Sequence, residues 1–284
     1  MLANFTEENW QKNNENWNDF WSGKITRPMI FIERMDKTIA DPPGFHSYFQ
    51  QYDNDLSSKE ILKIEMERFK RIQYMGDGIP RRFTNFGPGS VATYLGSECT
   101  CDDSTVWYHD VGKELKDIDI RLNRNSFWYK RVQDIQNTLF SEMGNEVNIS
   151  FSDMGGNLDI LASLRGSQNL LYDLYDNPEV VEQQGYQITK EWLVCYQEEV
   201  ERLSGPRGFM PWAPIYSPSK TTYMLQCDFS YMISTNMFER YVMPDLTSCC
   251  EAIDIPFYHL DGKGELPHLS LILTIEKLKG VQWI

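Results

Sequence analysis

Val147-Asn-Ile-Ser-Phe-Ser-Asp153 runs directly into Met-Gly-Gly156 and then Asn157-Leu-Asp159. The apolar residues of this stretch predict a buried strand, and the paired glycines allow a tight turn and close backbone approach to a ligand. The segment after the glycines is typical of a helix that starts on polar caps. A strand that ends in polar residues and leads into a helix is the repeating unit of a parallel α/β fold.

The same unit recurs toward the carboxyl end. We expect strands over 208–213, 224–228, 255–260 and 280–284, and helices over 178–203, 234–242 and 268–278. Polar residues follow several of these strands, as at the mouth of a barrel. Neither a Gly-x-Gly-x-x-Gly nor a Gly-Lys-Ser/Thr loop occurs, so a dinucleotide or P-loop site has no support. The pattern favours a (β/α)8 TIM barrel over a doubly wound sheet.

The chain before residue 81 predicts an N-terminal helical extension packed on the barrel. Thr6 can cap a helix that Gly23 ends, and a strand follows over 28–33. A Ser57-to-Glu60 capping box opens a helix through about residue 73. Further on, we expect a strand and exit loop over 82–89, a hairpin around 105–108 and a helix over 127–142. We therefore divide a single structural domain into an extension, 1–80, and a TIM barrel, 81–284.

The number of strands falls short of a complete barrel. From residue 81 onward we expect six, near Phe83, Val147, Phe209, Met224, Pro256 and Val281. A closed barrel of this class needs eight. We therefore expect the last two βα units to be missing. An open barrel exposes a sheet edge, so we expect low monomer stability or completion by a second chain.

Charge and hydropathy exclude several classes of function. The 284 residues carry 41 acidic and 27 basic side chains, for a net charge of −14. Such a surface repels phosphate backbones, so we expect no nucleic-acid partner. There is no long apolar run or basic signal segment, so we expect no membrane contact and a cytoplasmic location.

His259-Leu-Asp261-Gly262 is the sharpest local motif. Residues i and i+2 of a strand face the same way, so His259 and Asp261 would both point into the barrel mouth. They could hold a metal together, or Asp261 could orient His259 for acid–base work. The alternative is a structural hydrogen bond at a strand end.

Other candidate site residues follow the remaining strands. Asp153 and Asp228 are candidate proton-transfer groups. Asn157, Asp159 and Arg165 are candidates for substrate binding, although the two acceptors could instead cap a helix and Arg165 could pair with an acid. The remaining candidates for substrate binding are Tyr216, Gln282 and Trp283.

The chain from about Val147 to Ile284 resembles the uroporphyrinogen decarboxylase superfamily. Four motifs carry the resemblance: Asp153-Met-Gly-Gly-Asn-Leu-Asp-Ile-Leu-Ala-Ser-Leu-Arg-Gly166, Asp176-Asn-Pro-Glu179, Phe229-Ser-Tyr-Met-Ile-Ser234 and His259-Leu-Asp-Gly262. The resemblance implies a (β/α)8 barrel with its site at the carboxyl ends of the strands. Members include tetrapyrrole decarboxylases and zinc-dependent methyltransferases that use corrinoid proteins, and they are often homodimers.

Two motifs separate these branches. True decarboxylases hold the substrate's carboxylates with an Arg-Gln-Ala-Gly-Arg segment, whereas the nearest basic cluster here is Arg81-Arg82. The methyltransferase branch holds zinc with His-x-Cys, and here His259 matches while Asp261 replaces the cysteine. An oxygen ligand is harder than a thiolate, so the zinc expectation is weakened without being removed.

The resemblance therefore favours methyl transfer between a corrinoid, supplied by a partner protein, or another methyl donor and a small acceptor. His259, alone or with Asp261 and zinc, would activate the acceptor, and Asp228 or Asp153 would take the proton. Two alternatives stay open. One is a decarboxylase acting on another acidic substrate, and the other is a non-catalytic barrel that binds a small or tetrapyrrole-like ligand.

Overall fold

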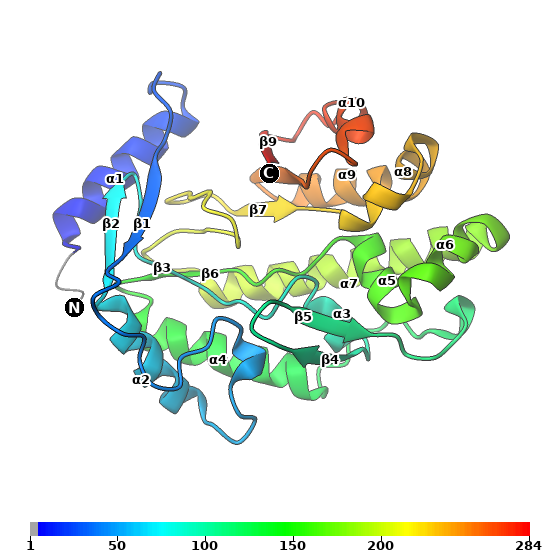
Figure 1. The fold of residues 1–284 in the computed structure, drawn as a ribbon. Helices are drawn as coiled ribbons and strands as arrows, with labels where there is room; N and C mark the ends of the chain where they lie inside the picture. The colour runs from blue at the N-terminus through cyan, green and yellow to red at the C-terminus, as the bar shows by residue number, and fades with distance from the viewer. Residues whose placement is uncertain (1–4) are drawn as a thin grey trace.

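Parallel strands and covering helices form the middle of the molecule, as expected of a mixed α/β chain (Figure 1). The computed structural model describes residues 5–284. Strand β3 (Arg81–Phe83) pairs in parallel with β6 (Asn148–Ser150). The second parallel sheet has the order β7-β8-β9, with bounds Thr222–Leu225, Ile255–Leu260 and Gly280–Trp283. Five of the six expected strands are thus present.

The segment 208–213 departs from the expected strand. The Phe151 N–H donates to the Met210 carbonyl at 3.0 Å, so the segment does lie beside β6. It forms only one bridge, between Phe209 and Ser217, because the nearby Pro211 has no N–H to extend a ladder. Within residues 5–284, the sheets remain open and do not close into a barrel.

Helices cover one side of these strands and follow their carboxyl ends. Their bounds are α3 (Val91–Tyr94), α4 (Phe127–Met143), α5 (Asn157–Arg165), α6 (Ser167–Asp176), α7 (Pro178–Leu203), α8 (Thr235–Tyr241) and α9 (Met243–Ala252). Their ends follow the sequence signals: Pro178 occupies the first turn of α7, and the Ser234 hydroxyl accepts from the Met237 N–H. Together with the strands they bury one large apolar core.

The segment 268–278 is less helical than expected. Its only α-helix is α10 (Leu269–Ile272), which follows the 3-10 turn η4 (Leu266–His268). Further turns at Ile275 and Leu278 then deliver the chain to β9, whose pairing with β8 starts at Gly280. Pairing of β9 with β8 therefore takes precedence over the helical periodicity of this segment. The other 3-10 turns are η1 (Phe49–Gln51), η2 (Leu115–Asp117) and η3 (Asp228–Met232).

Two antiparallel hairpin-like ladders lie outside the parallel strands. The expected hairpin is confirmed as β4 (Glu98–Cys101) with β5 (Val106–His109). The helix opened by Ser57 is α2 (Ser58–Phe69), which ends earlier than expected. Residues Ile72–Gly76 instead form β2, which pairs with β1 (Phe31–Met35). Pairing with β1 explains the early end, because it claims backbone groups that a longer helix would use.

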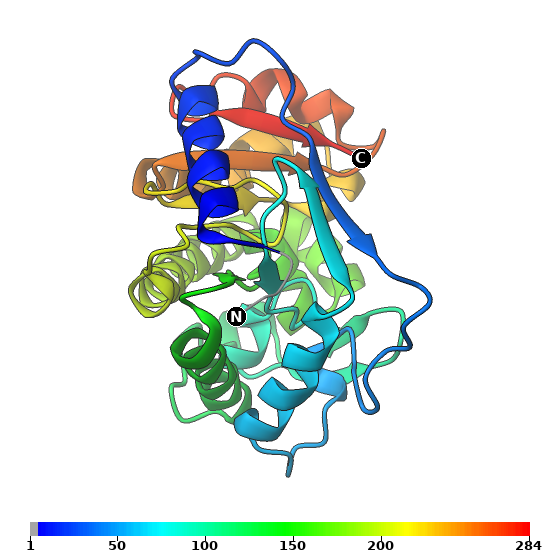
Figure 2. The same cartoon turned by 90° about the vertical axis from the view of Figure 1, so that its left-hand side faces the viewer.

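Helix α1 (Glu7–Trp21) lies across the end of the molecule that faces the viewer in Figure 2. It buries Trp10 and Trp17 in a second, smaller apolar cluster with Ile79, Met210 and Tyr216. The Trp21 indole N–H donates to the Tyr216 carbonyl at 2.9 Å, and its ring meets Phe257 of β8 edge-on. Helix α1 therefore packs against both β8 and the residues just before β3.

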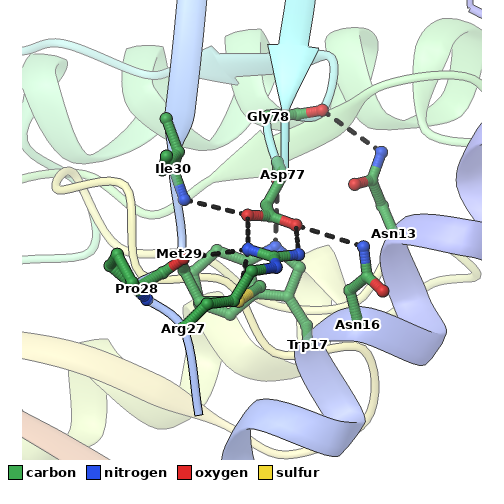
Figure 3. A network of polar contacts seen from close by, with 9 residues as sticks. All are labelled: Asn13, Asn16, Trp17, Arg27, Pro28, Met29, Ile30, Asp77 and Gly78. Atoms are coloured by element: carbon green, nitrogen blue, oxygen red, sulfur yellow. Dashed lines mark hydrogen bonds and ion pairs between the residues drawn. The ribbon is translucent and has the colours of Figure 1, made fainter. Parts of the chain in front are cut away.

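A polar clasp ties the chain around α1 to the turn before β3 (Figure 3). The buried Asp77 carboxylate accepts two bonds of 2.7 Å from the Arg27 guanidinium and one from the Ile30 N–H. Asn16 donates to the same carboxylate, and the Trp17 indole donates to the Asp77 carbonyl. The hydrogen bond from Arg27 holds the pKa of Asp77 below its usual value.

Among residues 5–284, no helix is long and apolar enough to cross a membrane.

Candidate functional site

The turn after β6 presents Asp153 and is held from several sides. The Tyr223 hydroxyl donates to the Ser152 carbonyl and accepts from the Met154 N–H, at 2.8 and 2.9 Å. The Asp153 carbonyl accepts from the N–H groups of Gly89 and Ser90, at the end of the loop between β3 and α3. The turn is therefore a rigid platform for the Asp153 carboxylate.

The two glycines of this turn are required by its geometry. Gly155 has φ +78, and a Cβ there would lie 2.7 Å from the Gly89 Cα. A Cβ on Gly156 would collide with the Gln226 carbonyl at the end of β7. The tight turn is present, but the close approach expected toward a ligand is instead made to the protein's own backbone at Gly89 and Gln226.

Asp159 joins the carboxyl ends of β6 and β7. Its carboxylate accepts from the backbone N–H groups of Phe229, Gly156 and Asp228, at 2.8, 3.1 and 3.2 Å. Asp159 therefore positions the start of η3 and has its acceptors largely occupied. Burial raises its pKa, and the backbone donors act in the opposite direction.

Asp228, His259 and Asp261 come together at the ends of β7 and β8. One potential ligand atom from each lies within 4.8 Å of the other two. Asp228 and Asp261 are exposed, and His259 is half-buried. The expectation that His259 and Asp261 share a face is met by this arrangement, and the structure adds Asp228 to the pair. We call these three residues the Asp-His-Asp cluster.

The His259 ring is fixed by two neighbours. Its Nδ1 lies 2.7 Å from the Gln282 Oε1 on β9, and the Trp212 ring meets it edge-on at 5.0 Å. With the amide oxygen facing the ring, Nδ1 donates and Nε2 keeps its lone pair for a ligand. Gln282, expected to bind substrate, instead orients His259.

Burial, together with the charges of neighbouring acids, raises the pKa of several carboxyl groups around this cluster. Burial raises the pKa of Asp153 to about 7, with repulsion from Asp159 adding to it. The pKa of Asp228 rises to about 8 because of partial burial first and the charges of Asp159 and Asp153 next. The Asp228 side chain keeps one face in water, so the neighbouring charges are the firmer cause. Groups of this kind can exchange protons near neutral pH.

Glu265 is a member of this acidic group that the sequence did not single out. It is buried, and the Tyr258 hydroxyl donates to its carboxylate at 3.3 Å. Burial raises its pKa to about 7. A signal for Glu265 was present in the sequence, because it directly follows the Gly262-Lys-Gly264 turn after β8, and its N–H donates to the Gly262 carbonyl at 3.3 Å.

Three of the expected substrate-binding residues are engaged elsewhere in the structure. Asn157 donates to the Tyr241 carbonyl at 2.8 Å, inside the helical layer. Arg165 donates to Asp173 and Glu114, so it takes the alternative of pairing with acids. The Tyr216 hydroxyl donates to Asn14 under α1, so Tyr216 faces the α1 cluster.

Trp283 and Cys227 differ sharply in their exposure to solvent. Trp283 of β9 is 54% exposed and available for stacking on a ligand. Cys227 is fully buried, and burial with the charge of Asp159 raises the pKa of its thiol well above the usual value. A thiol in that setting is a packing group and a poor nucleophile.

Comparison with known proteins finds a likeness in structure only. No family model matches this sequence, and no curated protein matches it. Among solved structures, it is similar to a methyltransferase from Methanosarcina mazei, with a TM-score of 0.59 and 11% identity. The match covers 81% of this chain and 71% of that chain. At this identity the likeness shows a shared fold.

Proposed function

We propose that this protein is a methyltransferase of the uroporphyrinogen decarboxylase superfamily, built on an incomplete (β/α) barrel formed by residues 81–284. The observation that carries the proposal is the Asp-His-Asp cluster at the carboxyl ends of adjacent parallel strands. In barrel enzymes that edge is where chemistry takes place. The fold shared with a methyltransferase supports the same reading.

The donor set of the cluster fits a metal ion. Ligands of tetrahedral zinc lie about 2.0–2.2 Å from the ion, so neighbouring donor atoms lie roughly 3.4 Å apart. The donors here are within 4.8 Å of one another, a spacing that side-chain rotation can close. One imidazole and two carboxylates match a catalytic zinc site with an open position, and they also suit harder ions.

The metal would act as a Lewis acid that lowers the pKa of a small acceptor such as a thiol. His259 would bind it through Nε2, with Gln282 holding the ring. Asp228 and Asp261 would supply the oxygen ligands. Asp153, whose pKa is about 7, would accept the acceptor's proton. The methyl group would come from a corrinoid held by a partner protein, or from another methyl donor, at the open end of the strands.

Two measurements test this assignment. The first is zinc binding by the metal-free protein, in wild type and His259→Ala, with His109→Ala of the exposed hairpin as a matched control. The second is methyl transfer from methylcobalamin to 2-mercaptoethanol by the same three proteins. We expect His259→Ala alone to lose both properties. Equal zinc affinity and equal activity in all three would overturn the proposal.

A decarboxylase is the second candidate, and the raised pKa values favour it. At neutral pH a carboxyl group with a pKa of about 7 or 8 is partly protonated, so Asp153, Asp228 or Glu265 could protonate a carbanion after loss of carbon dioxide. Arg165 is not free to hold the substrate's carboxylate, since it pairs with Asp173. Release of carbon dioxide from small dicarboxylic acids, without methyl transfer, would select this alternative.

A further inference from the structure

A pocket of about 220 Å³ lies beside β3, and none of its lining residues belongs to the Asp-His-Asp cluster. Arg68 of α2 and Arg81 and Arg82 of β3 all line it. Three guanidinium groups around one cavity are unusual in a chain whose net charge is −14. The rest of the surface repels anions, so this arrangement creates a local exception.

Two of the three arginines are compensated by the protein. The Arg82 guanidinium donates two bonds of 2.7 and 2.8 Å to the buried Glu65 carboxylate. Arg81 donates to the Trp212 carbonyl at 2.9 Å and lies 3.3 Å from Glu33. The charges of Arg82 and Arg81 are therefore balanced by the carboxylates of Glu65 and Glu33.

Arg68 has no such compensation. Among residues 5–284 its side chain has no hydrogen bond and no ion pair, and its Nε is buried without a partner. Its guanidinium lies over the Phe45 ring, 4.8 Å from the centroid. Burial, and then repulsion from Arg82, lowers the pKa of Arg68, yet arginine stays charged at any physiological pH. The pocket therefore carries one surplus positive charge.

We infer that this pocket binds a small oxyanion, that is, a carboxylate or phosphate group. A partly buried guanidinium without hydrogen bonds is costly, and an oxyanion would satisfy it in bidentate geometry. The volume lies below the roughly 300–1,000 Å³ typical of sites for drug-sized ligands, so it suits a small anion or the anionic end of a larger molecule. The amide of Asn85, at the wall of the pocket, supplies a further polar group.

The inference does not depend on the proposed methyl transfer. Its test is calorimetric titration of the protein with inorganic phosphate and, separately, with malonate, at constant ionic strength in potassium chloride. We expect saturable binding of at least one anion, and the stronger of the two identifies the preferred group. Arg68→Gln should raise its Kd at least about tenfold, since a hydrogen bond to a charged group is worth about 1.5–3 kcal/mol.

Arg34→Gln is the matched control. Arg34 is exposed on β1, next to the pocket residue Glu33, but does not line the pocket. Its loss removes the same charge and should leave Kd within about twofold, because exposed charges are screened. If Arg68→Gln fails to fold, Ser47→Asp replaces it: Ser47 is an exposed wall residue, and an added carboxylate there should also raise Kd about tenfold. No saturable binding of either anion, or equal weakening by the pocket variant and by Arg34→Gln, would overturn the inference.

Discussion

Gln282 holds His259 across the β8–β9 pair: its Oε1 lies 2.7 Å from the imidazole Nδ1, and the two residues are register partners. This contact sets the direction of the other ring nitrogen, Nε2. Neighbours that orient a ligating histidine in this way commonly matter nearly as much as the ligand itself. The relationship gives the most direct test of the Asp-His-Asp cluster.

Replacing Gln282 with leucine should weaken zinc binding about 10–100-fold while leaving all three ligands in place. Leucine keeps the bulk of the side chain but cannot accept from Nδ1. The measurement is a competition titration against a zinc-chelating dye. Trp283→Leu, at the exposed neighbouring position, is the control and should bind zinc as wild type does. Unchanged affinity in Gln282→Leu would remove the orienting role.

Asp153→Asn should stabilise the protein more at pH 8 than at pH 5. The folded pKa of Asp153 is about 7, above its unfolded value of about 4, so folding favours the protonated form. Wild type therefore loses stability as pH rises through about 7, when the buried carboxylate must ionise. Asparagine does not ionise and can still accept from the Gly155 N–H.

A shift of roughly three pKa units corresponds to a full penalty of about 4 kcal/mol, and about 3 kcal/mol of it falls between pH 5 and pH 8, because the penalty already begins to grow above the unfolded pKa. Urea unfolding of wild type and variant at both pH values measures it. Asp55→Asn, at an exposed loop position, should show no such pH dependence. A stabilisation that is equal at pH 5 and pH 8 would mean that Asp153 ionises normally.

Asp77→Ala should destabilise the attachment of α1 by about 2 kcal/mol, because it leaves three donors without their acceptor. The pKa of Asp77 is lowered, so its contribution is present above about pH 4 and is lost as pH falls through the folded value. Wild type and variant should therefore converge in acid. Chemical unfolding followed by tryptophan fluorescence measures the loss, and Trp10 and Trp17 contribute to that signal among the eight tryptophans of the chain.

The control for this experiment is Asp119→Ala, which breaks the exposed ion pair with Arg121. Such pairs contribute about 0–1 kcal/mol, so this variant should unfold almost as wild type does. If both variants lose the same stability, the clasp around Asp77 adds nothing beyond an ordinary surface contact.

Arg165→Gln should cost about 3 kcal/mol of stability without changing zinc affinity. The Arg165 guanidinium lies 2.7 Å from the buried Asp173 carboxylate, and its loss leaves that charge unpaired. Thermal unfolding and the zinc titration described for Gln282 measure the two effects. A stable variant that had lost ligand binding would instead return Arg165 to the substrate-binding role expected from the sequence.

Local signals in the sequence predicted the elements whose ends are set by their own residues. Ser57 and Ser234 cap the helices they precede, and Pro178 starts α7. Strands that depend on distant partners were harder to place. The pairing of 72–76 with β1 and the irregular path of 208–213 are decided by tertiary contacts, which periodicity does not encode.

The residues of the candidate site show the same contrast between local sequence signals and tertiary contacts. His259 and Asp261 were predictable because strand alternation fixes their common direction. Asp228 lies at the expected strand end, but its closeness to them depends on the β7–β8 register. Arg165 and Tyr216 could not be excluded from the sequence, because their partners Asp173 and Asn14 are chosen only when the chain folds. Glu265 follows the glycine turn after β8, but its closeness to the other carboxyl groups depends on how that loop folds.

Helix α1 is synthesised well before several of its partners, which lie far along the chain. The bond from Trp21 to the Tyr216 carbonyl spans 195 residues, and the ring contact with Phe257 spans more. Contacts so distant along the chain form slowly, because the intervening loop must close before they contribute. During translation the α1 tryptophans are therefore exposed until the residues that bury them have been synthesised. Exposed apolar side chains of this kind promote aggregation or chaperone binding. We therefore expect closure of the α1 cluster to be a late event in folding.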